Sequence, residues 1–341
     1  MGATVAIVGD NTLLAQTLVD VLAQRQLAIE STFILLPGSI QQVDEHTPLG
    51  INPPKHFPVQ EQFINNVDFS KIDIVFVISV DDEMENLIGQ SLAGGSTVID
   101  CSGYSASQSD IPLILPALNS HESPDLRPNS VIALPSPAAT LLSRVVFPLA
   151  AEFICERITV CHYSSASAHG KTGVERLAGE TARLLNGMPL SKGQQQSAFN
   201  LVPQSGAIDD KGYTETELGL MRQCERLLGV GNLIVNATCI QVPVFYGQSQ
   251  ALELQFNQPI EVAQATAILK GVADIDLVEA YESSPVVAQR QADEERIVVS
   301  RLRQNSRDER SLSLWCGSDD LRLGAAVGAV QIAEILIKSY L

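Results

Sequence analysis

The sequence predicts an α/β chain of two domains: a doubly wound parallel sheet, followed by an α+β domain whose sheet is mostly antiparallel. A length of 341 residues suits about two domains. Residues 5–36 run strand, turn, helix, strand, and this βαβ order favours a parallel sheet. Towards the C-terminus, strands follow one another directly, which is typical of an antiparallel sheet.

The first domain is expected to cover residues 1–130, with residues 321–341 returning to it. Short apolar runs bounded by turn signals predict buried strands, and the helices between them complete a Rossmann-like arrangement. The helix at 323–340 is apolar on nearly every side early on, so we expect it to be buried against this domain. The predicted strands are 5–8, 32–36, 72–79 and 97–100, and the other predicted helices are 12–26 and 82–93.

The second domain is expected at residues 131–320. It begins with a strand at 131–133 that turns into a helix. Ser136 is the expected N-cap, and Pro137 suits the first helical position, where an N–H would be unpaired anyway. Residues 165–173 and 195–211 are predicted loops, and 246–248 a turn. The other predicted strands are 157–164, 232–244, 251–256, 296–302 and 312–315, and the other helices are 174–185, 214–228 and 260–272.

The chain is acidic, with a formal net charge of −17. This charge argues against nucleic acid and anionic membranes as partners, since both require a basic surface. Six cysteines without C-x-x-C spacing indicate free thiols in a reducing compartment. The sequence shows no signal-peptide pattern and no membrane-spanning apolar run, so we expect a cytoplasmic protein. Five scattered histidines offer no ligand spacing, so we expect no metal site.

Gly9, Asn11, Thr12, Leu13 and Leu14 lie in the turn after the first strand, where a dinucleotide pyrophosphate would meet a helix N-terminus. Such a turn uses three glycines to let the backbone approach the phosphates. Here a threonine and an alanine stand at the later two positions, and an acidic residue follows the first. Binding of NADP or NAD and ordinary strand–helix packing are therefore both open for these residues.

Two further stretches carry candidate chemistry. Ser167, His169 and Lys171 lie in a loop of small residues before a helix, a setting that could hold an anion. The alternative is a capped helix start with a solvated lysine. Cys101 directly follows a predicted strand, where it could be a nucleophile facing a cleft or a buried structural thiol.

Longer motifs run through both domains: V-A-I-V-G-D-N-T-L-L-A, V-I-D-C-S-G, D-I-P-L-I-L-P-A-L-N, S-S-A-S-A-H-G-K-T-G-V-E-R-L-A-G-E, S-A-F-N-L-V-P, G-Y-T-E-T-E-L, Q-V-P-V-F-Y-G-Q-S and D-D-L-R-L-G-A-A-V-G-A-V-Q-I-A-E. With these motifs the chain resembles the aspartate-semialdehyde dehydrogenase family over nearly its whole length. S-A-S-A-H-G-K and Q-V-P-V-F-Y-G resemble its Usg branch in particular. The resemblance implies the semialdehyde dehydrogenase fold, an NADP-binding first domain, and a homodimer formed through the second domain.

The resemblance also implies a reaction: a cysteine thiolate attacks an aldehyde, hydride passes to NADP, and phosphate cleaves the thioester. In amino-acid biosynthesis this sequence runs in reverse. Matched position by position, the family's nucleophile falls on Pro137, its catalytic histidine on Gln248, and its substrate-binding arginine on Gln241. Proline offers no nucleophile, and glutamine takes up no proton near neutral pH.

Other positions of the family pattern differ as well. A phosphate-binding arginine falls on about Ala106, and a substrate-site lysine on about Gly219. In the cofactor site, the middle glycine falls on Thr12, a Gly-Gly pair on residues 80–81, and an asparagine on about Gly328. Loss of one member of a cooperating catalytic set usually removes most of the rate.

These substitutions favour a pseudoenzyme: a cytoplasmic homodimer that keeps the fold and acts in binding or assembly, with a second protein such as an active dehydrogenase as a candidate partner. One alternative is an NAD(P)-dependent oxidoreductase acting on an aldehyde or acyl phosphate, with a nucleophile such as Cys101. Another is a nucleotide or metabolite sensor in which His169 and Lys171 hold an anion.

Overall fold

A computed structural model describes residues 2–36, 51–64, 67–79, 84–119, 126–190, 193, 195–204, 206–278 and 295–340. The chain forms two compact units, the first made of Met1–Ser136 and Ala325–Leu341 and the second of Pro137–Gly324. The first unit thus extends past the expected boundary at residue 130, because strand Val131–Ala133 pairs within its sheet. The second unit continues to Gly324, where an added Cβ would lie 2.7 Å from the Cβ of Pro137.

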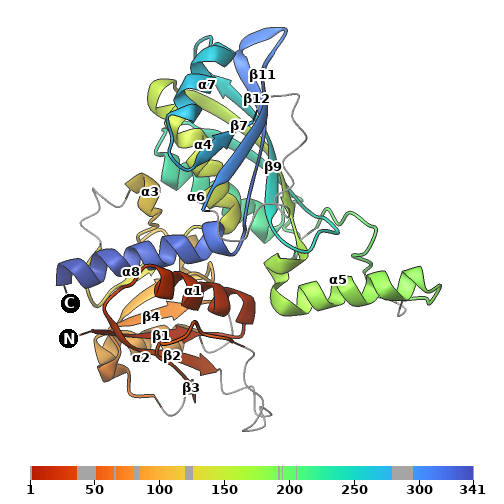
Figure 1. Ribbon diagram of the computed structural model, residues 1–341. Helices are drawn as coiled ribbons and strands as arrows, with labels where there is room; N and C mark the ends of the chain where they lie inside the picture. The colour runs from red at the N-terminus through yellow and green to blue at the C-terminus, as the bar shows by residue number, and fades with distance from the viewer. Residues whose placement is uncertain are drawn as a thin grey trace. The chain divides into compact units, whose positions relative to one another are not determined.

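The first unit is a doubly wound parallel sheet, as the sequence predicts, and it has six strands in the order β3-β2-β1-β4-β5-β6 (Figure 1). Its central strands are continuous apolar runs, which suit a sheet covered on both faces. The edge strand β3 lies in a stretch without apolar alternation and is missed by sequence patterns. The strands are β1 (Ala3–Val8), β2 (Ile29–Leu36), β3 (Val59–Phe63), β4 (Ile74–Val77), β5 (Thr97–Asp100) and β6 (Val131–Ala133).

Helices α1 (Thr12–Gln24), α2 (Met84–Gly94), α3 (Pro116–Asn119) and α8 (Val327–Tyr340) complete the first unit. The Asn11 side chain caps α1 by accepting from the N–H of Leu14 at 3.3 Å. α8 continues a π-helical turn at Arg322–Ala326 and contacts α1, α3 and β5. The expected burial of this last helix against the first domain is therefore confirmed. Arg322–Tyr340 is long and apolar enough to span a membrane, but buried core helices share these properties, and most of its apolar side chains are buried here.

The second unit is built on a six-stranded sheet in the order β10-β11-β12-β9-β7-β8. Three of its five pairings are antiparallel, as expected of a mostly antiparallel sheet, and β10 with β11 and β7 with β8 are parallel, so the sheet is mixed. Strand order depends on how distant segments meet, which local patterns do not reveal. The strands are β7 (Cys155–Ser164), β8 (Ile234–Gln241), β9 (Gln248–Phe256), β10 (Ile275–Leu277), β11 (Ile297–Asn305) and β12 (Asp308–Ser318).

Helices α4 (Pro137–Glu152), α6 (Glu215–Leu228) and α7 (Val262–Lys270) lie along one face of this sheet (Figure 1). The capping box of Thr214 and Glu217 starts α6, and Gly229 in the left-handed region ends it. The predicted loop at 165–173 is instead a 3₁₀ turn (Ala166–His169) leading directly into α5 (Gly170–Leu185). α5 extends away from the sheet and buries few of its residues.

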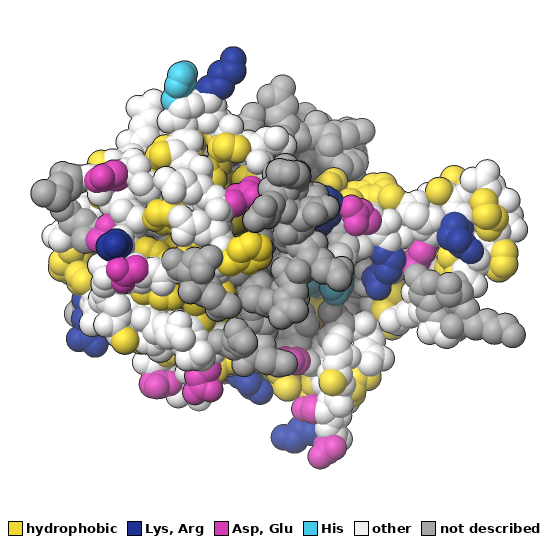
Figure 2. Space-filling model, turned by 90° about the horizontal axis from the view of Figure 1, so that it is seen from below, with side chains coloured by type: hydrophobic (Ala, Val, Ile, Leu, Met, Phe, Trp, Pro, Cys, Tyr) yellow, Lys and Arg dark blue, Asp and Glu magenta, His cyan; other side chains and the backbone are white. Residues whose placement is uncertain are grey.

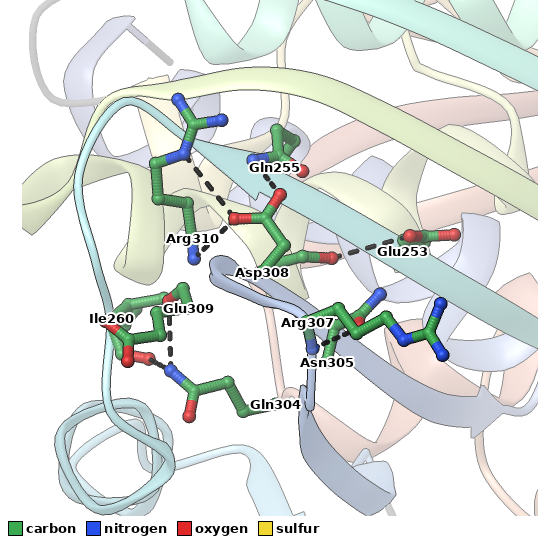
Figure 3. A network of polar contacts seen from close by, with 10 residues as sticks. Glu253, Gln255, Ile260, Gln304, Asn305, Arg307, Asp308, Glu309 and Arg310 are labelled. Atoms are coloured by element: carbon green, nitrogen blue, oxygen red, sulfur yellow. Dashed lines mark hydrogen bonds and ion pairs between the residues drawn. The ribbon is translucent and has the colours of Figure 1, made fainter.

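The β11–β12 hairpin is closed by side-chain contacts at its tip (Figure 3). Asp308 accepts hydrogen bonds from the backbone N–H of Arg310 at 3.0 Å and from the Gln255 amide at 2.9 Å. The Gln304 amide donates to the carbonyls of Ile260 and Glu309. These bonds tie the hairpin to β9 and to the segment before α7. The hydrogen bonds to Asp308 hold its pKa below its usual range, and the bond from the Arg310 backbone is the largest cause.

Candidate functional site

The first turn of α4 lies beneath one end of β9. The Gln248 side-chain amide donates to the carbonyl of Pro137 at 2.9 Å and to Oγ of Ser318 at 3.2 Å. Gln248 is only 4% exposed, and its Oε1 has no hydrogen-bond partner among the described residues. The predicted turn at 246–248 is corrected here, because Gln248 is already the first residue of β9. The residues matched to the family's nucleophile and histidine are therefore neighbours.

A second glutamine, Gln250, points to the same helix from the next inward position of β9. Its amide nitrogen donates to the carbonyl of Ala138 at 2.8 Å and lies 3.4 Å from Nδ1 of His162. Its Oε1 accepts a weak bond from the Cys316 thiol. Burial lowers the pKa of His162 to about 4, so this imidazole is neutral at neutral pH.

A buried carboxylate holds the loops beside Gln248. Asp320 accepts hydrogen bonds from Oγ of Ser167 at 2.7 Å and from the N–H of Gly247 at 2.8 Å. The Ser167 hydroxyl also lies 2.8 Å from that of Ser165. Burial raises the pKa of Asp320, its hydrogen bonds oppose that shift, and Asp319 adds to it. Asp320 thereby joins the segments that follow β7 and precede β9.

The structure does not assemble the expected anion site from Ser167, His169 and Lys171. The Ser167 hydroxyl donates to a carboxylate, which an anion would have to displace. The His169 side chain is hydrogen-bonded to Gln241, and burial, followed by nearby Arg176, lowers its pKa. Lys171 is exposed and lies 3.9 Å from Glu175 on the same helix. The side chains of these three residues contact different partners. This arrangement agrees with the alternative in which Lys171 is a solvated lysine at a helix start.

Gln241, at the position of the family's substrate arginine, is buried at the end of β8. Its backbone forms a two-way bridge with Val202, with distances of 2.8 and 3.0 Å. This bridge brings the segment around residue 200 beside the site. Gly219 lies within α6, Ala106 is buried in a 3₁₀ turn of the first unit, and residues 80–81 lie outside the described residues.

The turn predicted to bind a nucleotide is compact. Gly9 has a φ of +138°, and an added Cβ would lie 2.4 Å from Oγ of Ser79, so only glycine fits. The N–H of Thr12 donates to the carbonyl of Asp10 at 2.9 Å, and Asn11 caps Leu14. Leu13 is half-buried and Leu14 is buried in the core. The start of α1 is thus occupied by the chain's own polar groups.

Five of the six thiols lie in surroundings that raise their pKa. Cys101 is half-buried, and burial, with a smaller contribution from Asp100, raises its pKa. Burial also raises the pKa values of Cys155, Cys224 and Cys239 to about 12, and that of Cys316 further. A thiol needs a lowered pKa to be a good nucleophile at neutral pH, so these environments disfavour covalent chemistry.

The sequence predicts neither a metal site nor a nucleic-acid surface for the part of the chain that the structure describes. In that part, the His, Cys, Asp and Glu residues form no group of three or more that could hold a metal ion. On the face drawn in Figure 2, the Lys and Arg side chains lie apart from one another rather than in one continuous patch.

Sequence reasoning missed Ser318, Asp320, His162 and Gln250 as members of this cluster. A usable signal was present for Gln250, because Gln248 and Gln250 occupy alternate inward positions of an otherwise apolar strand face. The other three come from β7 and from the end of β12 and the residues after it. Only the folded sheet brings those segments together.

Comparison with known domain families gives two matches. Residues 4–125 match a domain described as "Semialdehyde dehydrogenase, NAD binding domain". Residues 146–323 match "Semialdehyde dehydrogenase, dimerisation domain". The two matches correspond to the parallel-sheet unit and the mixed-sheet unit.

Individual proteins show the same similarity. An aspartate-semialdehyde dehydrogenase of Shewanella sp. (strain DB6705) is 30% identical over 338 residues, covering 98% of both chains. A Pseudomonas aeruginosa protein called "USG-1 protein homolog" is 32% identical over 280 residues, covering 82% of this chain and 83% of that one. The crystal structure of aspartate semialdehyde dehydrogenase II from Vibrio cholerae superposes with a TM-score of 0.89 at 30% identity, covering 100% of both chains.

Proposed function

Because this chain belongs to the aspartate-semialdehyde dehydrogenase family, we propose that it keeps the family's fold and dimeric assembly without its thiol-dependent reaction. In this proposal it is a homodimer that acts by binding. The observation that carries the proposal is the 2.9 Å contact between the Gln248 amide and the Pro137 carbonyl. It places a proline and a glutamine together where the resemblance implies a nucleophile and its base.

Neither residue can replace the chemistry that is missing. The Pro137 ring carries no nucleophilic atom, and it lies so near Gly324 that a Cβ added there would be 2.7 Å from the Pro137 Cβ. Gln248 already donates through its amide nitrogen, and an amide oxygen does not take up a proton near neutral pH. The raised pKa of Cys101 argues against that thiol as a substitute nucleophile.

The proposal is tested by assaying the purified protein with aspartate semialdehyde, phosphate and NADP, and in reverse with aspartyl phosphate and NADPH. We expect rates equal to a blank in both directions. A Cys101→Ser variant should match the wild-type protein in both directions. Turnover above the blank that is lost in Cys101→Ser would contradict the proposal and favour the oxidoreductase alternative.

For the dimer we propose the sheet face opposite α4, α6 and α7 as the contact surface. The match to a dimerisation domain over this unit supports a homodimer. On this face Tyr163 and Trp315 stack with ring centroids 5.3 Å apart, and both side chains are only half-buried. Small side chains such as Ala251 and Ser313 lie beside them in register, which leaves room for a second copy.

A Trp315→Glu variant tests this surface, because a charge at its centre would have to be buried in the dimer. We expect a dimer for the wild-type chain and a monomer for Trp315→Glu, measured by light scattering after size exclusion. Trp315→Phe keeps the aromatic contact and should stay dimeric. A dimeric Trp315→Glu protein would place the interface elsewhere.

A further inference from the structure

We propose that the start of α4 binds a small molecule through an uncharged hydrogen-bond donor, such as a primary amide or a hydroxyl group, which donates to Oε1 of Gln248. This inference rests on the proposed function, because it assigns a ligand class to a site that lacks the family's catalytic groups. The family reaction would bring an acyl phosphate here instead.

The orientation of the Gln248 amide is set by its neighbours. Its nitrogen faces the Pro137 carbonyl, which can only accept a hydrogen bond, at 2.9 Å. The opposite orientation would place two oxygens against each other. Oε1 is therefore left as a buried acceptor without a partner in the described part of the chain. A buried polar atom in this state costs free energy, and a ligand donor would recover it.

Gln250 provides an internal comparison on the same strand face. It is fully buried, and it too donates to a carbonyl of the α4 first turn. Unlike Gln248, its Oε1 has a partner, the thiol of Cys316. Gln248 and Gln250 thus both donate to a carbonyl of α4, but only Gln248 has a buried acceptor oxygen without a partner among the described residues.

The charges around Gln248 favour an uncharged donor over an anion. The neighbouring Gly247 is hydrogen-bonded to the buried carboxylate of Asp320, with Asp319 beside it. His169, beyond Gln241, is held towards its neutral form. Arg176 is an exposed cation near His169, whereas Arg322 pairs with Glu295. A phosphate or carboxylate at Gln248 would meet Asp320 first and would also face an acceptor oxygen.

Ligand entry is expected past residues 242–247, the rim segment, which leads directly into Gln248 at the start of β9. Val244, Phe245 and Tyr246 on this rim are all exposed. The rim is held by backbone bonds from Ala166 to Val244 and from Ser167 to Phe245. Gly247, with a φ of +86°, is the last residue of this segment before β9. Val242 and Gly247 are also hydrogen-bonded, to the Ser164 carbonyl and to Asp320, so both ends of the segment are anchored.

The test uses two matched pairs of probes, asparagine against aspartate and glutamine against glutamate. Each pair has nearly the same shape and differs in an amide donor against a carboxylate. Thermal unfolding and calorimetric titration of the full chain should show binding of at least one amide and about tenfold weaker binding, or none, of its acid, a ratio worth roughly one hydrogen bond.

Two variants separate a ligand role from a structural one. Gln248→Leu should abolish amide binding and, because it also removes the amide's hydrogen bonds to the Pro137 carbonyl and to Oγ of Ser318, should lower the ligand-free Tm. Gln250→Leu should lower the Tm and retain amide binding. Binding of neither amide, preference for the acids, or amide binding that survives in Gln248→Leu would overturn the inference. Dehydrogenase turnover would instead refute the proposed function, so the two failures are distinguishable.

Discussion

The starts of α1 and α4 differ in how their polar groups are used. At α1, Asn11 caps the helix with its own side chain, and the N–H of Thr12 bonds to Asp10. At α4, the first residue is Pro137, and two glutamines of β9 contact the carbonyls of the first turn. At α1 two N–H groups of the helix start bond to neighbouring residues of the chain. At α4 the Oε1 atom of Gln248 is buried and has no partner among the described residues.

The two helix starts therefore differ in whether a buried polar group is available to bind a ligand. Both starts depart from the pattern that the family resemblance implies, in one case by Thr12 and in the other by Pro137 and Gln248. At α1 the chain's own groups accept hydrogen bonds from the N–H groups of Thr12 and Leu14, in a unit that matches an NAD-binding domain. At α4 a proline and a glutamine, joined by a hydrogen bond, stand where the resemblance implies a nucleophile and its base. A shared fold therefore does not decide what each helix start binds.

The largest expected effect lies behind the start of α4, at His162. Its pKa is about 4 in the folded protein and ordinarily 6.5, so between these values the unfolded chain binds a proton that the folded chain does not. The stability contribution is complete above pH 6.5 and is lost as the pH falls towards 4, a total of roughly 3 kcal/mol.

This loss can be followed by denaturant titration across the pH range. Trp315 is the only tryptophan and lies in the second unit, so its fluorescence reports the relevant part of the chain. In His162→Gln the acid-side loss should shrink by the same amount. An unchanged pH profile in His162→Gln would contradict the claim that His162 causes this acid-side loss of stability.

A smaller effect is expected at Asp320, which holds the rim beside Gln248. Asp320→Ala removes the acceptor of the buried Ser167 hydroxyl and of the Gly247 N–H, and should cost about 2 kcal/mol in the free energy of unfolding. Asp320→Asn is the matched control. Its oxygen can accept from Gly247 and its nitrogen can donate to Ser167, so its stability should stay near wild type. Equal losses in both variants would contradict this assignment.

The smallest effect is expected at the start of α1. Asn11→Ala removes the cap of Leu14 and should cost about 1 kcal/mol, whereas Asn11→Ser, which retains a capping oxygen, should cost much less. Chemical denaturation of both variants measures the difference. If Asn11→Ala is neutral, the start of α1 is not closed by this side chain and the contrast with α4 weakens.

Sequence patterns predict the buried parts of this fold well. β1, β4, β5 and β6 are apolar runs, and the helix starting at Pro137 follows from its N-terminal residue. β3 was missed because an edge strand with exposed side chains carries no such run. The parallel pairing of β7 with β8 could not be foreseen, since it is decided by the path of the chain between them.

The candidate site was only partly predictable. Family resemblance singles out Pro137, Gln241 and Gln248 by position. The turn signal at Gly247 hid the fact that Gln248 begins a strand facing α4. The partnership of Asp320 with Ser167 joins residues 153 positions apart and has no local signature.

The contrast between the two helix starts is tested most directly by calorimetric titration of the dialysed wild-type protein with NADPH. A turn closed by Asn11, with the exposed Asp10 beside it, predicts no binding up to millimolar nucleotide. Binding at micromolar concentration would contradict this account. It would show that the start of α1 still accepts a pyrophosphate, and it would favour an oxidoreductase or a nucleotide sensor.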